Sequence, residues 1–514
     1  MTGSADYEVL ERPFLNVSAL LEQHGRYRPH QPAIICEDRQ ILWGEFDAGI
    51  SRIAHALLRD GLARNERVVI VMENCPEALQ AIFGVVRAGG CAVPISTMLQ
   101  PEQVAGLVAD SGARRIIASD SCAALLAEIA ADVAVIRHPE GFEAWLGDLP
   151  SRSPGLRFEQ NDEFNIIYSS GTTGLPKGIV QTHGAKMHFA FSNAVELGIT
   201  AQSHTLTTTA LYSNGTWIVL LPTLIAGGTL HVMPAFSAQS FIERVAAERI
   251  THSFMVPAQF LMILQRPELD GADLSSLQKL LCGGSPLRRE VKEEAMRRLT
   301  PNLSELYGFS EGFATMLHPQ DHARKGDSVG TPVLGYDMRV VDENGKECPP
   351  GTPGEIVGYG MGMLACYNRR PDLTADLIWR DETGRSFIRS GDIGTIDEEG
   401  FLRIVDRKKD MVISGGFNVF PTDVEAIIAR HPDVLDVAVI GIPHEKWGES
   451  CFALVIPRGT DTEFDCAAFT EWANARLSKP QRLAGAAVRQ DFPRNALGKV
   501  LKRELRLSLN DLTA

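Results

Sequence analysis

Residues 164–178 read FNIIYSSGTTGLPKG, and the rest of the chain is best interpreted outward from this stretch. Its first five residues are typical of a strand, and the loop that follows combines glycines and hydroxyl side chains with Lys177. Glycine lets backbone N–H groups approach an anion, hydroxyls donate hydrogen bonds and lysine adds a positive charge, so the loop suits a polyphosphate. The spacing is not that of a Walker loop. A flexible connection has a similar composition, so other parts of the chain must decide.

Short strand-like runs alternate with amphipathic, helix-like segments on both sides of this loop. Residues 68–72 read VVIVM, a helix-like segment then ends at Gly89-Gly90, and residues 91–95 are strand-like again. The same alternation continues to about residue 233. This order is typical of βα units, so we predict an α/β fold whose sheets are largely parallel and covered by helices.

The pattern changes after about residue 329. Short strands are now divided by turn sequences such as DENG at 342–345 and PPG at 349–351, which predicts a β-rich subdomain. The charged segment DRKKD at 406–410 separates this part from a final stretch with its own βαβ-like pattern. We therefore expect a large N-terminal domain over residues 1–408 and a smaller α+β C-terminal domain over 409–514, although a solvated turn would carry similar charges.

Composition excludes several classes of protein. The 514 residues carry a formal net charge of −14, which gives no general attraction for nucleic acid. The nine cysteines are scattered without a C-x-x-C pair, so they indicate small core residues in a reducing compartment and no zinc site. Neither a secretory signal nor a run of 18 apolar residues is found, so we expect a cytoplasmic protein without an integral membrane segment.

The loop GTTGLPKG at 171–178 resembles the hallmark of the adenylate-forming (AMP-binding) superfamily, which includes acyl-CoA synthetases, luciferases and peptide-synthetase adenylation domains. Each further motif would be commonplace alone, but six that resemble family motifs follow in the family's order. They are CGGSP at 282–286, LYGFSE at 306–311, RSGD at 389–392, DRKKD at 406–410, SGGFN at 414–418 and PRNALGKV at 493–500. The resemblance implies a carboxylate–CoA ligase that forms an acyl adenylate from ATP and then transfers the acyl group to CoA.

The resemblance also implies roles for particular residues around ATP or AMP. Tyr307 would stack on adenine, Ser310 would contact the α-phosphate region, and Asp392 and Arg407 would reach the ribose. Glu311 would help to hold Mg²⁺, a hard cation that prefers carboxylate and phosphate oxygens. The implied nucleotide site comprises Ser169, Ser170, Gly171, Thr172, Thr173, Gly174, Lys177, Gly283, Gly284, Ser285, Tyr307, Gly308, Ser310, Asp392 and Arg407.

Three residues would carry the catalysis, namely Lys499, Glu311 and Lys177. Lys499 would bridge the carboxylate and the nucleotide during adenylation. The C-terminal domain would be mobile and turn about a hinge at Lys409, bringing Gly415 and Gly416 to the CoA tunnel for the second step. In the family the terminal lysine is a target of protein acetyltransferases, so such an enzyme is an expected partner for Lys499.

The residues that would bind the carboxylic acid, here called the acyl end of the site, are less clearly indicated by sequence motifs. The family's P-x-[FY]-H-x-x-G stretch corresponds to TALYSNG at 209–215, where Tyr212 takes the usual histidine position. The stretch offers no aspartate for an α-ammonium group, and no pocket arginine is evident. These absences disfavour an amino acid and argue against a short dicarboxylate such as malonate. Apolar walls are predicted from Tyr212, Trp217, Met255, Phe309 and Phe313.

These walls predict a medium-chain fatty, alicyclic or aromatic acid as the substrate. Three alternatives stay open at this point. The acceptor could be a carrier-protein thiol, the enzyme could be a luciferase-like oxygenase, although the chain lacks a terminal S-K-L, or the protein could bind adenylates without catalysis.

Overall fold

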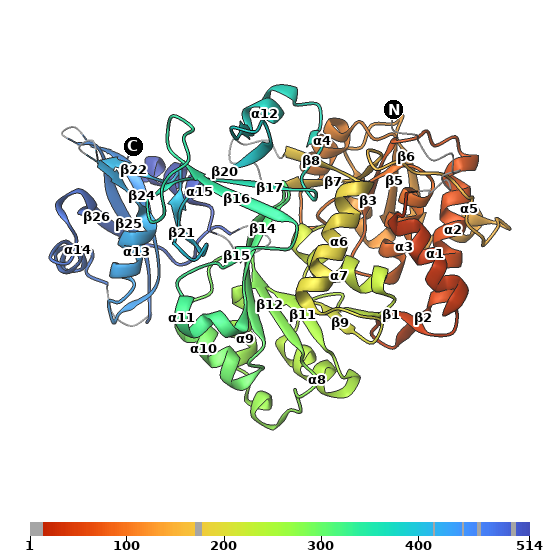
Figure 1. Cartoon of the computed structure of the whole chain (residues 1–514), viewed down its shortest axis with the longest axis horizontal. Coiled ribbons are helices and arrows are strands. Elements are labelled where there is room, and N and C mark those ends of the chain that lie inside the picture. The colour runs from red at the N-terminus through yellow and green to blue at the C-terminus, as the bar shows by residue number, and fades with distance from the viewer. Residues whose placement is uncertain are drawn as a thin grey trace, which may run out of the picture.

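The computed structural model describes residues 14–169, 177–414, 417–444, 447–459, 464–494 and 500–513. These residues form four sheets with helices packed on and between them (Figure 1). The helices are α1 (Val17–Tyr27), α2 (Trp43–Arg59), α3 (Pro76–Arg87), α4 (Pro101–Ser111), α5 (Phe142–Leu146), α6 (His183–Leu197), α7 (Asn214–Ala226), α8 (Ala238–Glu248), α9 (Pro257–Leu264), α10 (Arg289–Arg298), α11 (His322–Lys325), α12 (Pro371–Asp376), α13 (Pro421–Ile428), α14 (Cys466–Asn474) and α15 (Lys502–Thr513).

A seven-stranded sheet has the order β18-β8-β7-β4-β3-β5-β6. Its strands are β3 (Arg67–Val71), β4 (Cys91–Pro94), β5 (Arg115–Ser119), β6 (Ala134–His138), β7 (Glu163–Ser169), β8 (Lys177–Thr182) and β18 (Cys366–Tyr367). The strands from β7 to β6 pair in parallel, whereas β8 and β18 are added antiparallel at one edge. The predicted polyphosphate loop therefore joins two neighbouring strands, and its ends, Ser169 and Lys177, are paired in register.

A nine-stranded sheet has the order β15-β14-β13-β12-β11-β9-β10-β1-β2. Its strands are β1 (Pro32–Cys36), β2 (Arg39–Leu42), β9 (His204–Thr207), β10 (Thr229–Val232), β11 (His252–Met255), β12 (Lys279–Gly283), β13 (Leu303–Phe309), β14 (Phe313–Leu317) and β15 (Thr331–Pro332). Two family-like motifs lie at the ends of neighbouring strands here, because CGGSP begins with the last two residues of β12 and LYGFSE contains the end of β13. The carboxyl ends of parallel strands form one edge, so the topology brings both motifs together.

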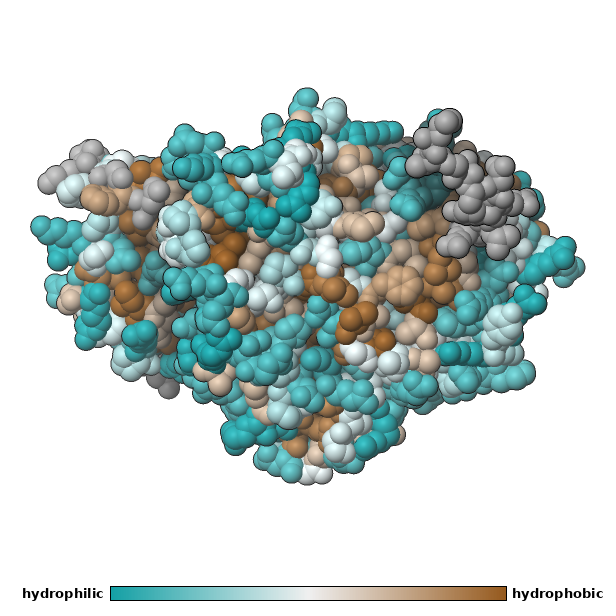
Figure 2. Space-filling view, viewed as in Figure 1, coloured by the Kyte–Doolittle hydropathy of each residue, from teal (hydrophilic) through white to brown (hydrophobic). Residues whose placement is uncertain are grey.

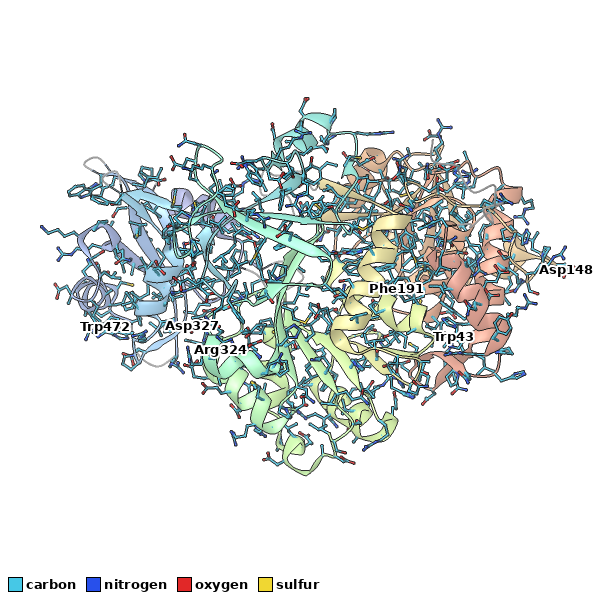
Figure 3. All side chains as sticks on the ribbon, in the orientation of Figure 1. Trp43, Asp148, Phe191, Arg324, Asp327 and Trp472 are labelled. Carbon is cyan, nitrogen blue, oxygen red and sulfur yellow. The ribbon has the colours of Figure 1, made fainter. Side chains whose placement is uncertain are left out.

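Helix α7 is apolar on all sides, as expected for a helix buried within the core of a large protein. It packs against α6 and shares a core cluster with α1, α2 and α3. Trp217 of α7 makes edge contacts with Phe83 and Phe164. On the outer side of α6, Phe191 and Val195 are 47% and 66% exposed, and hydrophobic side chains gather there in Figure 2. Figure 3 shows Phe191 on this outer side.

The later part of the chain forms two smaller sheets. The β-rich subdomain contains β16 (Tyr336–Val341), β17 (Gly354–Gly360), β19 (Ile378–Arg380), β20 (Ser386–Ile396) and β21 (Leu402–Arg407). The C-terminal sheet contains β22 (Val412–Ser414), β23 (Phe417–Val419), β24 (Val434–His444), β25 (Gly448–Pro457) and β26 (Leu483–Val488), with α13, α14 and α15 around it. Figure 1 shows this C-terminal part at the left, next to β20 and β21.

The chain changes sheets between Arg407 and Val412, a segment that brackets the boundary predicted at 408/409. The buried Asp406 links both sides, because its Oδ2 accepts a hydrogen bond of 3.0 Å from the backbone N–H of Thr422 in α13. The predicted α/β class, with helix-covered sheets, a β-rich subdomain and a smaller C-terminal domain, is confirmed. Within the described residues, no helix is both long enough and apolar enough to cross a membrane.

Candidate active site

Three predicted ribose and adenine residues from three strands meet at one point. Asp392 of β20 is 5% exposed, and its Oδ2 accepts a hydrogen bond of 2.8 Å from the Tyr307 hydroxyl of β13. Its other oxygen, Oδ1, lies 3.0 Å from Nε of Arg407. The register of β20 and β21 pairs Asp392 directly with Arg407. Burial, followed by the Asp392 carboxylate, raises the pKa of Tyr307, so this hydroxyl remains a donor at neutral pH.

The glycine motifs bring two strands close together beside Tyr307. A Cβ atom at Gly283 would lie 3.1 Å from the carbonyl oxygen of Leu306, its register partner. A Cβ atom at Gly308 would lie 2.6 Å from the carbonyl oxygen of Phe313, so a larger residue could not be accommodated without a backbone shift. Gly284 has a φ of +91°, which favours glycine, and half-buried Ser285 follows it. These residues form a tight turn beside β13, and its contact with adenine stays a prediction.

The predicted phosphate and metal residues lie around Tyr367, a tyrosine that no sequence motif indicated. Lys177, at the start of β8, has its Nζ 5.0 Å from the centre of the Tyr367 ring. The Tyr367 hydroxyl donates a hydrogen bond of 2.6 Å to Oε1 of Glu311. Half-buried Ser310 precedes Glu311 in the chain. Tyr367 lies in ACYNRRP at 365–371, far from the other motifs in sequence, so nothing in its local pattern indicated this contact.

Glu311 fits the role of a magnesium ligand. Its carboxylate is half-buried, and among the described residues Oε1 accepts from Tyr367 while Oε2 has no hydrogen bond. No group of three or more His, Cys, Asp or Glu residues that could hold a metal by itself occurs in the described ranges. A single carboxylate suits Mg²⁺, which keeps several waters and takes its other ligands from substrate phosphates.

Several predicted residues lie outside the described residues. They are Ser170, Gly171, Thr172 and Thr173 with Gly174 in the polyphosphate loop, Gly415 and Gly416, and Lys499. Their flanking residues are described. Ser169 is the last residue of β7, and Arg494 and Val500 form an isolated antiparallel bridge on either side of residues 495–499. The Arg494 guanidinium lies 2.6 Å from Asp436, which also accepts from Arg288 of the N-terminal domain at 2.9 Å.

The predicted hinge lysine, Lys409, is exposed between two anchored neighbours. On its N-terminal side, Lys408 lies 3.1 Å from the buried carboxylate of Glu355 in β17. On its C-terminal side, the carboxylate of Asp410 lies 3.3 Å from Arg506 of α15. Lys409 therefore separates a residue held by the β-rich subdomain from one held by the C-terminal domain.

At the acyl end, the structure corrects part of the predicted set. Trp217 and Met255 are 0% exposed and Phe313 is 2% exposed. Trp217 donates a hydrogen bond of 2.9 Å from Nε1 to the carbonyl oxygen of Leu211, and all three residues belong to core clusters. Side chains closed to solvent cannot form the surface of an open pocket, so we remove these three from the pocket wall. Tyr212 and Phe309 are half-buried and stay in the predicted wall.

An unexpected charge lies behind the stretch that contains Tyr212. Lys186 of α6 is 0% exposed, and its Nζ donates a hydrogen bond of 3.4 Å to Oδ1 of Asn214. The rings of Phe189 and Trp217 lie 5.0 and 5.2 Å from this nitrogen. Burial lowers the pKa of Lys186 to about 7. Nothing in the local sequence around Lys186 distinguishes a buried lysine from a surface one, so no motif indicated this residue.

Comparison with known proteins shows the family of this chain. The AMP-binding enzyme family matches residues 21–368, and the AMP-binding enzyme C-terminal domain matches residues 423–499. The chain belongs to the AMP-binding enzyme family. It is an AMP-forming acyl-CoA synthetase, which joins a carboxylate to CoA through an adenylate and uses ATP, Mg²⁺ and CoA.

Individual relatives of this AMP-binding enzyme are similar over nearly their whole length. A feruloyl-CoA synthase from Amycolatopsis sp is 32% identical over 489 residues, which cover 94% of this chain and 97% of the relative. A fatty acid–[acyl-carrier-protein] ligase, ScoC, from Streptomyces coeruleorubidus is 30% identical and covers 94% of each chain. The crystal structure of ATP-bound MatB from Rhodopseudomonas palustris is 28% identical and matches with a TM-score of 0.87, covering 97% of this chain and 100% of that one.

Proposed function

We propose that this acyl-CoA synthetase activates a hydrophobic monocarboxylic acid, namely a medium-chain fatty, alicyclic or aromatic acid. The observation that supports adenylation by these residues is the meeting of Tyr307 and Arg407 on the two oxygens of Asp392. Half-buried Tyr212 and Phe309 supply aromatic surface for the acid. A feruloyl-CoA synthase among the relatives favours the aromatic class.

In the first step, a carboxylate oxygen attacks the α-phosphorus of ATP. A new O–P bond forms, the bond to the β-phosphate oxygen breaks, and pyrophosphate leaves. The step brings two anions together, so its main requirement is neutralisation of charge and alignment of the reacting atoms. Lys177 and Lys499 would supply positive charge, and Glu311 would hold the Mg²⁺ ion, which would add positive charge next to the phosphate oxygens. No general base is needed because the carboxylate is already ionised at neutral pH.

In the second step, the CoA thiol attacks the acyl carbon of the adenylate. A C–S bond forms, the bond to the AMP oxygen breaks, and the thiol proton leaves to solvent. Lys499 is not required here, so the C-terminal domain turns about Lys409 and brings Gly415 and Gly416 to the CoA tunnel. The anchoring of Lys408 to Glu355 and of Asp410 to Arg506 supports a pivot at the residue between them.

A carrier-protein thiol is the second candidate acceptor. It is favoured by the similarity to ScoC, whose name gives an acyl carrier protein as its acceptor. The chemistry of the second step is unchanged, because the phosphopantetheine arm presents the same thiol. CoA and a carrier protein differ only in the part that lies outside the tunnel, which is a nucleotide in CoA and a protein domain in the carrier.

Pyrophosphate release distinguishes these possibilities. It is measured with ATP across fatty, alicyclic, aromatic and dicarboxylic acids, each with and without CoA. Turnover stimulated by CoA for one of the hydrophobic classes supports the proposal and names the acid. A single turnover that CoA does not affect indicates that the acceptor in the second step is a protein thiol. Preference for a dicarboxylic acid contradicts the proposed substrate class.

We further propose that the enzyme acts in the cytoplasm and that a protein acetyltransferase modifies Lys499. Acetylation would remove the charge that the first step requires. Mass spectrometry of the protein isolated from its host tests this idea. Detection of acetyl-Lys499 together with loss of adenylation supports it, and only unmodified Lys499 contradicts it.

A further inference from the structure

The segment before and through β18 crosses directly over Glu311. The backbone N–H of Leu364 donates to the carbonyl oxygen of Glu311 at 2.7 Å. Further along, Ala365 N–H donates to Val180 O at 2.8 Å and Asn368 N–H donates to Gly178 O at 2.7 Å. The backbone around Tyr367 is therefore fixed both to Glu311 and to the strand that begins at Lys177.

The Tyr367 side chain is equally constrained. It is 3% exposed, and its backbone N–H donates to Oγ1 of Thr374 at 3.0 Å. The Tyr367 hydroxyl is the donor in its hydrogen bond with Glu311, because an ionised carboxylate can only accept. One buried ring thus touches a proposed magnesium ligand through its hydroxyl and a proposed phosphate-binding lysine through its face.

The alternative to this arrangement is a direct ion pair. Lys177 and Glu311, both within the described residues, contact the same ring but do not form an ion pair with each other. Opposite charges attract, and more strongly in a partly buried site than in bulk water. A direct pair would occupy the carboxylate that Mg²⁺ needs and the ammonium group that the phosphates need. A ring face also attracts a cation without neutralising it.

We propose that Tyr367 is a positioning residue that keeps Lys177 and Glu311 apart and orients both toward the nucleotide. Its hydroxyl holds Oε1 of Glu311 so that Oε2 is available to Mg²⁺, and its ring holds the Lys177 ammonium group. This proposal rests on the roles proposed above for Glu311 and Lys177. It adds a residue that no motif indicated.

Two substitutions separate the hydroxyl from the ring. Tyr367→Phe keeps the ring and the packing but removes the donor to Glu311, whereas Tyr367→Leu removes both contacts. A hydrogen bond to a charged group predicts that Tyr367→Phe raises the Mg²⁺ concentration for half-maximal pyrophosphate release by about 10- to 100-fold. Wild-type Mg²⁺ dependence in Tyr367→Phe would overturn the proposal.

A binding readout independent of turnover uses the rise in Tm caused by ATP, measured with EDTA and with Mg²⁺. In Tyr367→Phe, the rise with EDTA should equal that of the wild type. The additional rise should be lost at the Mg²⁺ concentration that is half-maximal for the wild type. In Tyr367→Leu, the rise with EDTA should fall as well, because Lys177 loses its support. An undiminished Mg²⁺-dependent rise in both variants would also overturn the proposal.

Two further variants identify which assignment fails. Tyr168→Phe removes a similar bond, since the Tyr168 hydroxyl donates to Asp110 at 2.8 Å, and should lower Tm without changing the Mg²⁺ dependence. A changed Mg²⁺ dependence in Tyr168→Phe would mean that loss of any such bond has this effect, and so would overturn the special role of Tyr367. Glu311→Gln should lose the Mg²⁺-dependent rise. If it keeps that rise, the metal role of Glu311 fails; if it loses the rise and Tyr367→Phe keeps it, only the role of Tyr367 fails.

Discussion

The nucleotide end and the acyl end of the site differ sharply in how their predicted residues are arranged. At the nucleotide end, Tyr307 and Arg407 contact the two oxygens of Asp392 at 2.8 and 3.0 Å, although the three residues come from different strands. At the acyl end, three of the five predicted wall residues are sealed in the core. Only Tyr212 and Phe309 remain half-buried.

The difference follows from the chemistry of the residues at each end. A buried carboxylate needs specific donors, so a motif that contains one also fixes its partners. An aromatic or aliphatic side chain gains free energy from any apolar contact, and the core supplies far more of these than a pocket does. Polar motifs therefore predict a site, whereas apolar residues near a motif predict only burial.

The largest effect is expected for Lys499→Ala. Loss of a charge that stabilises the transition state should slow pyrophosphate release by about 10²- to 10³-fold, while CoA attack on preformed acyl adenylate stays largely intact. Both half-reactions are measured separately in single turnovers. Lys479→Ala, which removes an exposed lysine of the same domain, is the control. Equal loss of both half-reactions in Lys499→Ala would contradict the assignment.

The next effect is expected for Asp392→Asn. The change keeps the shape but removes the charge that orders Tyr307 and Arg407, so ATP should bind roughly 10- to 100-fold more weakly. Calorimetric titration with ATP measures the affinity. Asp397→Asn removes a carboxylate paired with Lys325, away from the site, and should leave the affinity unchanged. Wild-type affinity in Asp392→Asn would mean that the three-residue cluster supports the fold and not the nucleotide.

Substitution of Lys186, which lies behind the stretch that contains Tyr212, should change how the free energy of unfolding depends on pH. Its pKa of about 7 in the folded protein lies below the ordinary lysine value of 10.5, so the unfolded state binds more protons between these two pH values. Stability should therefore rise with pH over this range by about 1.4 kcal/mol per unit, and Lys186→Met should abolish that rise and stabilise the protein at pH 7. Urea unfolding across this range, with exposed Lys346→Met as control, measures the slope. An unchanged slope in Lys186→Met would show that Lys186 is not the titrating group.

The sequence predicted the fold class, and it named Tyr307, Asp392 and Arg407, which the structure brings together. The alternation of strands and helices can be predicted because buried side chains recur with the period of each backbone geometry. The glycines at 283 and 308 are required where two strands approach closely. Tyr367 could not be predicted, because its contact with Glu311 depends on a two-residue strand joining a distant sheet. Lys186 could not be predicted either, since only packing shows that a lysine on α6 faces inward.

The smallest effects should separate the two kinds of acyl-end residue. Trp217→Phe loses the hydrogen bond to Leu211 and leaves a smaller ring in the core, so it should lower the free energy of unfolding by about 1–3 kcal/mol. Because Trp217 is closed to solvent, the ranking of acids by kcat/KM should not change. Tyr212→Phe should do the reverse, changing the ranking by a few-fold, about what one contact in an apolar pocket contributes, with less than about 0.5 kcal/mol of stability lost. If Trp217→Phe alters the ranking and Tyr212→Phe does not, the acid reaches the core side of α7, and Trp217 returns to the pocket wall.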